Sequence, residues 1–537
     1  MLFAGMANLH NNPYFTAAYV KNYITDWKYK LEFAKLNGIT LGSSFMGSKT
    51  DNSNTASSTE PTAISIPVLV YHGVLLKTDN SKYNVTTEQF KNQMFALKEA
   101  GYKTISANDL LRYMRGEILL PQKSFLLTFD DGRKDTYFNG DPILKTVGFN
   151  AVMFIISHFT IEQDGTSYYL STEEIKQMEA TGRWDMQAHT FNGHGYVPID
   201  VAGDTAPFFG NKIWLKDQNR LETDDEYAVR ITNDLTTVKT QLENTLKKKI
   251  FAFAFPFGDH GQENTNYPAS DAVLLDHAMS LYSLLFFQYG GGIRYSENYF
   301  NSNATATPSY LIRRMDINPA WSGTEIVDEL NKANAKALPY TDDFSQNNGW
   351  NNNWIQSWGI TTIDGNGTLV LSPEVSNAGA ATVLDGSGGW KDYVATVTLN
   401  AQDQNGAYMW VRFQNDSNTA ACNFGNGFAH IEQIVNGKEK VIQGIVDPNI
   451  VIPKGDFKIT ARVQGRHVEC ILNNGISIST DYLDPTLNQG GIGFKTWNHM
   501  HGGNNLTIKN IQVNPYSAGT SSMPVVKNQE NPLVTSL

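Results

Sequence analysis

One change of pattern along the chain constrains its fold more than any other feature. From Ile66 to Phe255, short continuous apolar runs alternate with segments of helical spacing, whereas from Asp342 onward short runs of alternating apolar and polar residues follow one another. The first pattern is typical of buried parallel strands joined by helices, and the second of antiparallel strands with one solvated face. We therefore predict a multidomain chain, with a distorted α/β (β/α) barrel followed by an all-β jelly-roll sandwich.

The elements of the first pattern can be placed from the residues. A helix is predicted around residues 86–101, with Phe90, Met94 and Leu97 on one face, and another after Thr223 and Glu226, which form a capping-box pattern. Four strands are predicted, at residues 66–72, 125–129, 151–156 and 250–255.

Composition shifts suggest the domain boundaries. The polar, low-complexity stretch KTDNSNTASSTEP reads as a linker between an aromatic-rich start and the first strand. We expect a helical segment of unknown role at 1–48, a flexible linker at 49–62, the α/β domain at 63–338, the sandwich at 341–516 and a disordered tail at 517–537.

Charge and cysteine usage exclude several classes of protein. A net charge of -11 argues against a basic nucleic-acid surface. No stretch approaches the roughly 20 apolar residues of a membrane-spanning helix, and the first residues lack the features of a signal peptide. The two cysteines, Cys422 and Cys470, are either one bridge or a pair of buried thiols.

The segment TFDDG places Asp130 and Asp131 at the end of the strand predicted at 125–129. A DG pair alone commonly marks a turn. Two adjacent carboxylates at the C-terminal end of a barrel strand, however, lie where catalytic groups project, and their repulsion is most readily relieved by a metal ion.

A second motif supplies further metal ligands. AHTFNGH holds His189 and His194, whose spacing is out of phase for one helical face and favours a turn. A lone histidine is more commonly a packed or surface residue, but with Asp131 the pair makes a shell of two imidazoles and one carboxylate. We predict one divalent ion there, with zinc the first choice and nickel, cobalt or iron as alternatives.

The motifs VLVYHGV, TFDDGRKDTYFNGD, AHTFNGH, FAFPFG and LIRRMDI, in this order, resemble the polysaccharide deacetylase family with NodB homology (carbohydrate esterase family 4). The five-residue histidine spacing is similar to the branch that contains bacterial poly-N-acetylglucosamine deacetylases. The resemblance covers roughly 250 of the 537 residues.

The resemblance implies a role for each matching residue. Asp130 would be the general base, and Asp131, His189 and His194 the metal ligands. His72 would be the general acid, although a strand-end histidine can also be structural. Arg314 would keep Asp130 ionised, with Arg313 as the alternative because the register is open.

Further residues of the site follow from the same motifs. Pro256 and Phe257 lie in the FPFG turn, where the backbone N–H of Phe257 would hold the oxyanion. Trp184 and Trp321 would line the acetyl or sugar pocket, or else pack in the core. An insertion at about 195–221 carries PFFGNKIW, whose aromatics could line a glycan groove or form a covering loop.

The expected function is hydrolysis of linear amides, namely removal of N-acetyl groups from a polysaccharide that contains N-acetylglucosamine, such as poly-N-acetylglucosamine, peptidoglycan or chitin. An inactive carbohydrate-binding protein and an O-acetyl esterase are the alternatives. We expect an extracellular or cell-surface monomer with a polysaccharide substrate and without nucleic-acid partners. The C-terminal part resembles concanavalin-like and laminin-G-like modules, in which Trp390, Tyr393, Trp410 and Trp497 stack on sugars or pack in the core.

Overall fold

The computed structural model describes residues 28–35, 62–79, 81–262, 265–288, 310–345, 354–373, 378–401, 406–473, 475–497 and 506–517. The chain divides into two compact units, Met1–Ala333 and Asn334–Leu537. Each unit has its own buried core. They are described separately below.

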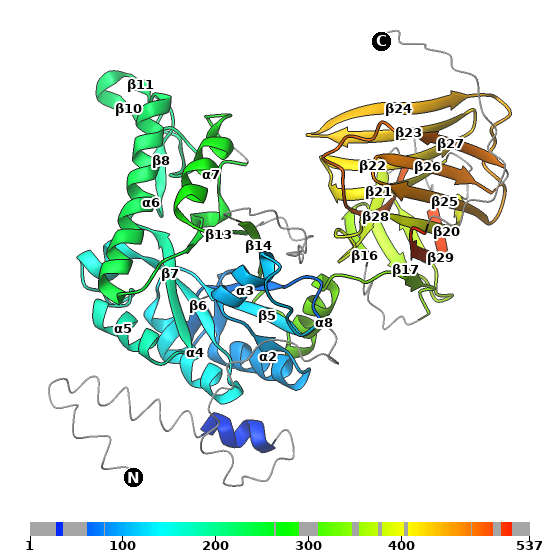
Figure 1. Ribbon diagram of the computed structural model, residues 1–537. Helices are drawn as coiled ribbons and strands as arrows, with labels where there is room; N and C mark the ends of the chain where they lie inside the picture. The colour runs from blue at the N-terminus through cyan, green and yellow to red at the C-terminus, as the bar shows by residue number, and fades with distance from the viewer. Residues whose placement is uncertain are drawn as a thin grey trace. The chain divides into compact units, whose positions relative to one another are not determined.

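The first unit is built on a closed barrel of parallel strands (Figure 1). Strand β1 pairs with both β5 and β14, which joins the two ends of the sheet, and β4 (Lys103–Thr104) adds to β5 outside the ring. This confirms the predicted distorted α/β barrel. The barrel strands are β1 (Val68–Tyr71), β5 (Ser124–Phe129), β6 (Ala151–Ile156), β7 (Trp184–Thr190), β12 (Ala252–Ala254), β13 (Leu284–Gln288) and β14 (Tyr310–Asp316).

Strand side chains alternate between the barrel interior and the surrounding helices. Val68 and Leu126 belong to the interior cluster, which α3 also contacts, whereas Leu69 and Leu127 pack in the larger core shared with the other helices. The predicted capping box of Thr223 with Glu226 is present before α6, and a further one, Thr86 with Gln89, precedes α2. The helices are α2 (Thr87–Glu99), α3 (Ala107–Met114), α4 (Lys134–Val147), α5 (Thr172–Ala180), α6 (Asp224–Leu246), α7 (Ser270–Leu281) and α8 (Gly323–Ala333).

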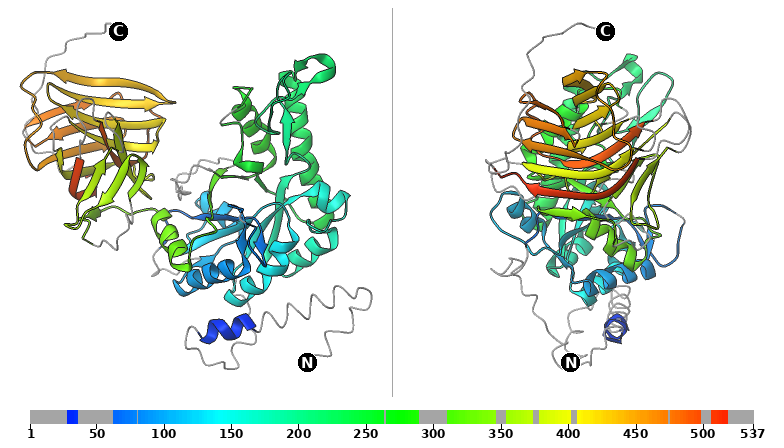
Figure 2. Two further views of the ribbon diagram at one scale, coloured as in Figure 1. Left: turned by 180° about the vertical axis from the view of Figure 1, so that it is seen from behind. Right: turned by 90° about the vertical axis from the view of Figure 1, so that its right-hand side faces the viewer.

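The second unit is a sandwich of two antiparallel sheets (Figure 2). One sheet has the order β17 (Ile360–Ile363), β18 (Leu369–Ser372), β29 (Leu506–Pro515), β20 (Tyr393–Ala401), β25 (Phe457–Gln464), β26 (His467–Leu472) and β27 (Ile476–Thr480), with β15 (Tyr340–Asp342) also on β29. The other has the order β16 (Trp354–Trp358), β19 (Gly379–Leu384), β28 (Gly491–Trp497), β21 (Ala407–Asn415), β22 (Asn418–Gly425), β23 (Phe428–Val435) and β24 (Lys438–Val446).

The two cysteines form a disulfide across this sandwich. Cys422 lies in β22 and Cys470 in β26, so the bond joins the two sheets through the buried core. The sequence left a bridge and free thiols open, because a separation of 48 residues gives no sign that two strands face each other. Trp390 and Tyr393 belong to the same core, which is the second of the two alternatives that the sequence left open for them.

Several of the expected segments lie largely outside the described residues. Residues 28–35 of the predicted N-terminal segment are helical; the rest of that segment, nearly all of the predicted 49–62 linker and all but the first residue of the 517–537 tail lie outside the described residues. Among the helices that are described, none has the length and apolarity needed to cross a bilayer.

Candidate metal centre

Asp130 and Asp131 directly follow β5, where the chain turns sharply into α4. Asp131 and Gly132 both have positive φ, 74° and 71°, which is a costly conformation for a residue with a side chain. A Cβ on Gly132 would also lie 3.0 Å from the Ile155 side chain. This turn therefore strains the backbone locally. It also directs the two adjacent carboxylates toward different partners.

Asp131 lies beside both histidines of the AHTFNGH motif. Its Oδ1 is 3.3 Å from His194 Nε2 and 3.6 Å from His189 Nε2, and one ligand atom from each residue lies within 4.8 Å of the others. Two ligands that share a tetrahedral zinc ion lie roughly 3.4 Å apart. The spacing, the donor types and the buried Asp131 Oδ1, which accepts no hydrogen bond in the described structure, all fit a divalent ion.

Hydrogen bonding and burial prepare these groups as ligands. The Nδ1–H of His189 donates to the carbonyl of Ala254 at 2.7 Å, which leaves Nε2 unprotonated and directed at Asp131. Burial lowers the pKa of His189 to about 4, so the ring is neutral at neutral pH. Burial would raise the pKa of Asp131, but His194 and the other imidazoles nearby lower it, so the carboxyl is ionised.

Asp130 forms a buried ion pair with Arg314. The guanidinium donates to both carboxylate oxygens, at 2.6 and 2.7 Å, and also to Gln288 Oε1 at 3.0 Å. Burial opposes ionisation of Asp130, but Arg314 and the neighbouring histidines lower its pKa below the usual value. Of the two arginines that the sequence left open, Arg314 makes this ion pair, whereas Arg313 is one position earlier on β14 and points to the other face of the strand.

His72 lies just after β1, at the same end of the barrel. Its carbonyl accepts from the Thr136 hydroxyl of α4 at 2.5 Å, and Gly73 N donates to Asn84 Oδ1 at 3.0 Å, so the loop is fixed on both sides. The His72 charge influences the pKa of both Asp130 and Asp131, which places its ring within electrostatic range of the cluster.

Asp316 is a site residue that the sequence did not single out. It ends β14 and pairs in register with Val70, two residues before His72. Burial raises its pKa, while Arg314 and His72 oppose the increase. The LIRRMDI motif contains this carboxylate, but only the pairing of β1 with β14 brings it near His72.

Asp234 of α6 holds the segment that carries the histidines. Its carboxylate accepts from Thr190 Oγ1 at 2.6 Å and from the backbone N–H groups of Phe191 and Asn192, both at 2.9 Å. Thr190 Oγ1 in turn accepts from Gly193 N at 2.7 Å. The chain from His189 to His194 is thus anchored to a helix that begins thirty residues later, a contact that no local motif reveals.

The predicted oxyanion turn adjoins His194. Pro256 and Phe257 lie in the short turn Pro256–Gly258 after β12, and Phe257 has φ 61°. The Phe257 ring lies 4.5 Å from the His194 ring and 5.3 Å from that of Tyr196. The turn therefore lies at the edge of the metal-ligand cluster, and Tyr196 is a further aromatic there that the sequence did not point out.

Trp184 and Trp321 are the two remaining residues that the sequence placed at the site. Trp184 faces the helices: its Nε1 donates to Asp141 of α4 at 2.8 Å, and its ring packs on Phe129 and Tyr137. On β7 its side chain points to the opposite face from that of His189. Trp184 therefore packs in the core and does not line the candidate site. Trp321 is half-buried against the same core and accepts from Gln93 through its carbonyl, so its pocket role stays a prediction.

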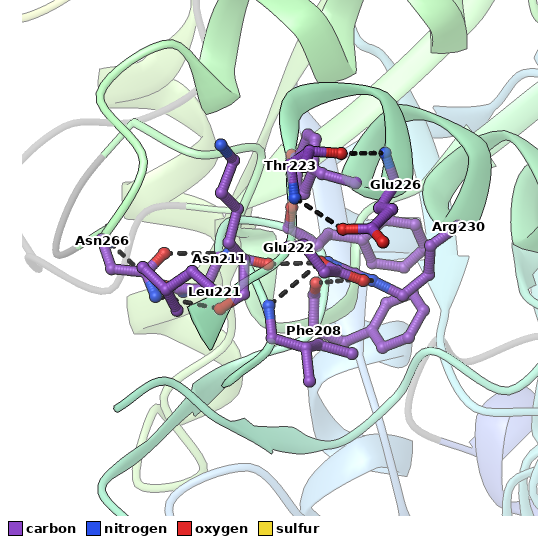
Figure 3. A network of polar contacts seen from close by, with 12 residues as sticks. Phe208, Asn211, Leu221, Glu222, Thr223, Glu226, Arg230 and Asn266 are labelled. Carbon is purple, nitrogen blue, oxygen red and sulfur yellow. Dashed lines mark hydrogen bonds and ion pairs between the residues drawn. The ribbon is translucent and has the colours of Figure 1, made fainter. Parts of the chain in front are cut away.

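The insertion at 195–221 is tied to α6 by Arg230 (Figure 3). Arg230 pairs with Glu222 at 2.8 Å and donates to the carbonyls of Phe208 and Asn211. Phe209 is buried in the core, whereas Phe208 lines an open cavity of about 670 Å³ beside α6. The insertion folds as the short strands β8 (Tyr196–Pro198), β9 (Thr205–Pro207), β10 (Trp214–Leu215) and β11 (Arg220–Leu221).

Known proteins match the barrel. Residues 119–272 match the polysaccharide deacetylase family. The chain is 26% identical over 192 residues to the poly-beta-1,6-N-acetyl-D-glucosamine N-deacetylase of Escherichia coli (strain K12), a match that covers 34% of this chain and 29% of that protein. It is 27% identical over 177 residues to the protein of the same name from Staphylococcus aureus (strain MRSA252), covering 33% of this chain and 54% of the relative. The chain thus spans about a third to a half of the length of these relatives.

Solved structures match parts of the chain at low TM-scores. A de-N-acetylase from Aggregatibacter actinomycetemcomitans covers 49% of this chain and 98% of its own, with TM-score 0.42 and 22% identity. A carbohydrate-binding module from Bacillus subtilis covers 30% of this chain and 95% of its own, with TM-score 0.25 and 15% identity. The fold assignment therefore rests on the strand order given above. The family match, together with these two relatives, establishes that the barrel contains a domain of the polysaccharide deacetylase family.

Proposed function

We propose that the barrel removes N-acetyl groups from a polysaccharide that contains N-acetylglucosamine, with poly-β-1,6-N-acetylglucosamine as the first candidate. One observation carries the proposal: a carboxylate and two imidazoles converge on a space the size of one cation, beside a second carboxylate held ionised by an arginine. The names of the matching relatives support the choice of polymer.

The metal-binding residues would be Asp131, His189 and His194, with zinc as the first candidate. A bound divalent ion supplies Lewis acidity for the acetyl carbonyl and lowers the pKa of a water molecule. Nickel, cobalt and iron suit the same nitrogen and oxygen donors, so the identity of the bound metal is to be measured by elemental analysis of the purified protein.

Asp130 would act as the general base. Both of its oxygens already accept from Arg314, at 2.6 and 2.7 Å, which keeps the carboxylate ionised and fixes its orientation. A carboxylate oxygen retains a second lone pair, so Asp130 can still take a proton from water. Arg314 would not contact the substrate. Its proposed role is to position Asp130.

His72 would protonate the departing amine. An amine is a poor leaving group unless it receives a proton as the C–N bond breaks, and a histidine is suited to that donation. Asp316 lies close to His72 through the pairing of β14 with β1. The Phe257 N–H would donate to the oxyanion, with Pro256 fixing the turn.

We also propose that the protein works outside the cytoplasm. The disulfide between Cys422 and Cys470 supports this, because such bonds persist in oxidising compartments and are rare in the cytosol. A polymer substrate would be found there as well.

Acetate release is the test of this function. The purified chain should release acetate from a β-1,6-linked N-acetylglucosamine oligomer, and Asp130→Asn should reduce the rate by at least about a hundredfold. Faster release from O-acetylated xylan would assign the esterase activity instead. No release from either polymer, peptidoglycan or chitin in the presence of zinc, nickel, cobalt or iron would leave the chain as a carbohydrate-binding protein only.

A further inference from the structure

Arg133 is a buried cation two residues after Asp131. It lies between the aspartate turn and α4 and is 6% exposed. A guanidinium stays charged in proteins, so its burial costs free energy unless acceptors surround it. The groups that surround Arg133 therefore show what this buried charge holds together.

Asp135 and Tyr168 give the guanidinium one fixed orientation. Nε and Nη2 of Arg133 donate to the two carboxylate oxygens of Asp135, at 3.0 and 2.6 Å, which fixes the plane of the group. The Tyr168 ring covers one face, with its centroid 4.6 Å from Arg133 Cζ. The backbone of Tyr168 is itself tied to the start of α4, because Lys134 N donates to its carbonyl at 2.9 Å. Arg133 is thus held firmly on the side of the aspartate turn.

The remaining edge of the guanidinium reaches the loop that follows His72. Arg133 Nη1 donates to Asn84 Oδ1 at 3.0 Å, and the same oxygen accepts from Gly73 N at 3.0 Å. Gly73 is the residue directly after His72. Asn84 directly follows Tyr83, whose ring centroid lies 5.6 Å from that of His72. One amide oxygen therefore joins the two ends of this loop to the arginine.

Gly73 provides the space that this contact needs. A Cβ at this position would overlap both Arg133 Nη2 and Asn84 Oδ1. The guanidinium is buried and bonded to Asp135, so it could withdraw only by breaking those hydrogen bonds. The glycine after His72 is therefore matched to the arginine of the neighbouring loop.

The contacts of Arg133 join two loops that leave adjacent strands. Tyr71 of β1 and Phe129 of β5 are register partners. The next residue is His72 in one loop and Asp130 in the other. The parallel pairing thus brings the two loops side by side, but it stops where the loops begin. Beyond that point side chains must hold the loops together, and the guanidinium is one of the groups that do so.

We propose that Arg133 is a positioning residue, which holds the loop that carries His72 against the turn that carries Asp131. Its importance for turnover rests on the proposed function, in which His72 donates a proton to the departing amine. Such a donor must lie within hydrogen-bond reach of the leaving group, and a displacement of about 1 Å can cost roughly a hundredfold in rate. Arg133 itself contacts neither the substrate nor the metal ion. Loss of the link should therefore slow proton donation and leave the metal ligands in place.

Amide hydrogen exchange in the full chain tests the link without turnover. In Arg133→Gln the Gly73 N–H should exchange roughly tenfold faster, because its acceptor on Asn84 loses a supporting hydrogen bond. Arg183→Gln is the matched control. Arg183 makes the same two-bond pair with Asp141 of α4, at 2.8 and 3.2 Å, but it precedes β7 at the opposite end of the barrel strands. This control should leave the exchange of Gly73 unchanged.

Kinetics on the same samples test the positioning role. Arg133→Gln should keep its metal ion and its KM for a β-1,6-linked N-acetylglucosamine oligomer, and lose roughly 10- to 100-fold in kcat. A substrate with a better leaving amine should recover part of this loss, since it depends less on the proton donor. Gly73→Ala should reproduce the loss, because its Cβ displaces the guanidinium, whereas Arg183→Gln should not.

The two readouts separate this inference from the proposed function. Unchanged Gly73 exchange in a folded Arg133→Gln chain, as judged by thermal melting, would overturn the link between the loops. A loss confined to KM or to metal content, or an equal loss of kcat in Arg183→Gln, would overturn the positioning role. Faster Gly73 exchange in Arg133→Gln, with an unmodified chain that releases no acetate, would refute the deacetylase and leave the link standing.

Discussion

At the scale of single residues, Asp130 and Asp131 are neighbours with opposite surroundings. Asp130 is paired with Arg314, and Asp131 faces His189 and His194. The positive φ of Asp131 produces this divergence. A carboxylate beside a cationic guanidinium stays ionised, whereas one beside two imidazoles offers donors that suit a metal ion, so the two adjacent aspartates can serve two proposed roles.

Arg314→Gln should make the activity more sensitive to acid. Burial raises the pKa of Asp130 and Arg314 lowers it, so loss of the guanidinium raises this pKa and protonates the base at higher pH. The acid limb of the kcat/KM profile should therefore move to higher pH. Removal of one partner of a buried pair should also cost about 3–5 kcal/mol of stability. Arg313→Gln, on the same strand, is the control; an equal shift in both variants would contradict the assignment.

His72→Ala tests the proton donor separately from the metal. We expect the variant to retain its metal ion, since His72 is not among the clustered ligands, and to lose roughly 10²- to 10⁴-fold in kcat. Metal analysis and acetate release on the same sample would measure both quantities. A substrate with a better leaving group should recover part of the lost rate; no recovery would assign His72 a structural role.

At the scale of elements, α6 positions the histidine segment through Asp234. Its carboxylate satisfies the Thr190 hydroxyl and two backbone N–H groups between the two histidines. Asp234→Ala should weaken metal affinity about 10- to 100-fold, as is typical for groups that orient ligands. Competition with a chelator would measure this. Asn233→Ala, one position earlier on α6, should leave the affinity unchanged, and equal losses would point to general damage to the helix.

The disulfide belongs to the sandwich alone. It closes a loop of 48 residues between the two sheets, and its loss should reduce the stability of that unit by about 4 kcal/mol on the chain-entropy account. Calorimetry with and without a reducing agent should show one transition moving to lower temperature while the barrel transition stays in place. The chain contains only two cysteines, so a shift of the barrel transition would contradict the separation of the two units.

At the scale of the whole molecule, the sequence predicts what depends on local pattern. The barrel strands 125–129 and 151–156 were placed to within a residue, because continuous apolar runs identify buried parallel strands. The cluster of Asp131, His189 and His194 could be predicted because its members fall within two short motifs. In the same way, the switch from helical to alternating spacing near Asp342 identified the sandwich.

What the sequence could not predict depends on contacts between distant segments. Asp234, Asp316 and the partner of Cys422 become apparent only when strands and helices have been paired. The two alternatives for Trp184 stayed open for the same reason, since its strand parity relative to His189 decides whether it faces the helices or the site.

The proposed function requires one divalent ion, held by Asp131, His189 and His194. Metal content per chain, measured by mass spectrometry on the same samples as acetate release, tests it most directly. We predict about one ion per chain in the unmodified protein, and loss of both metal and acetate release in Asp131→Asn and His189→Ala. Full acetate release by either variant without bound metal would contradict the account.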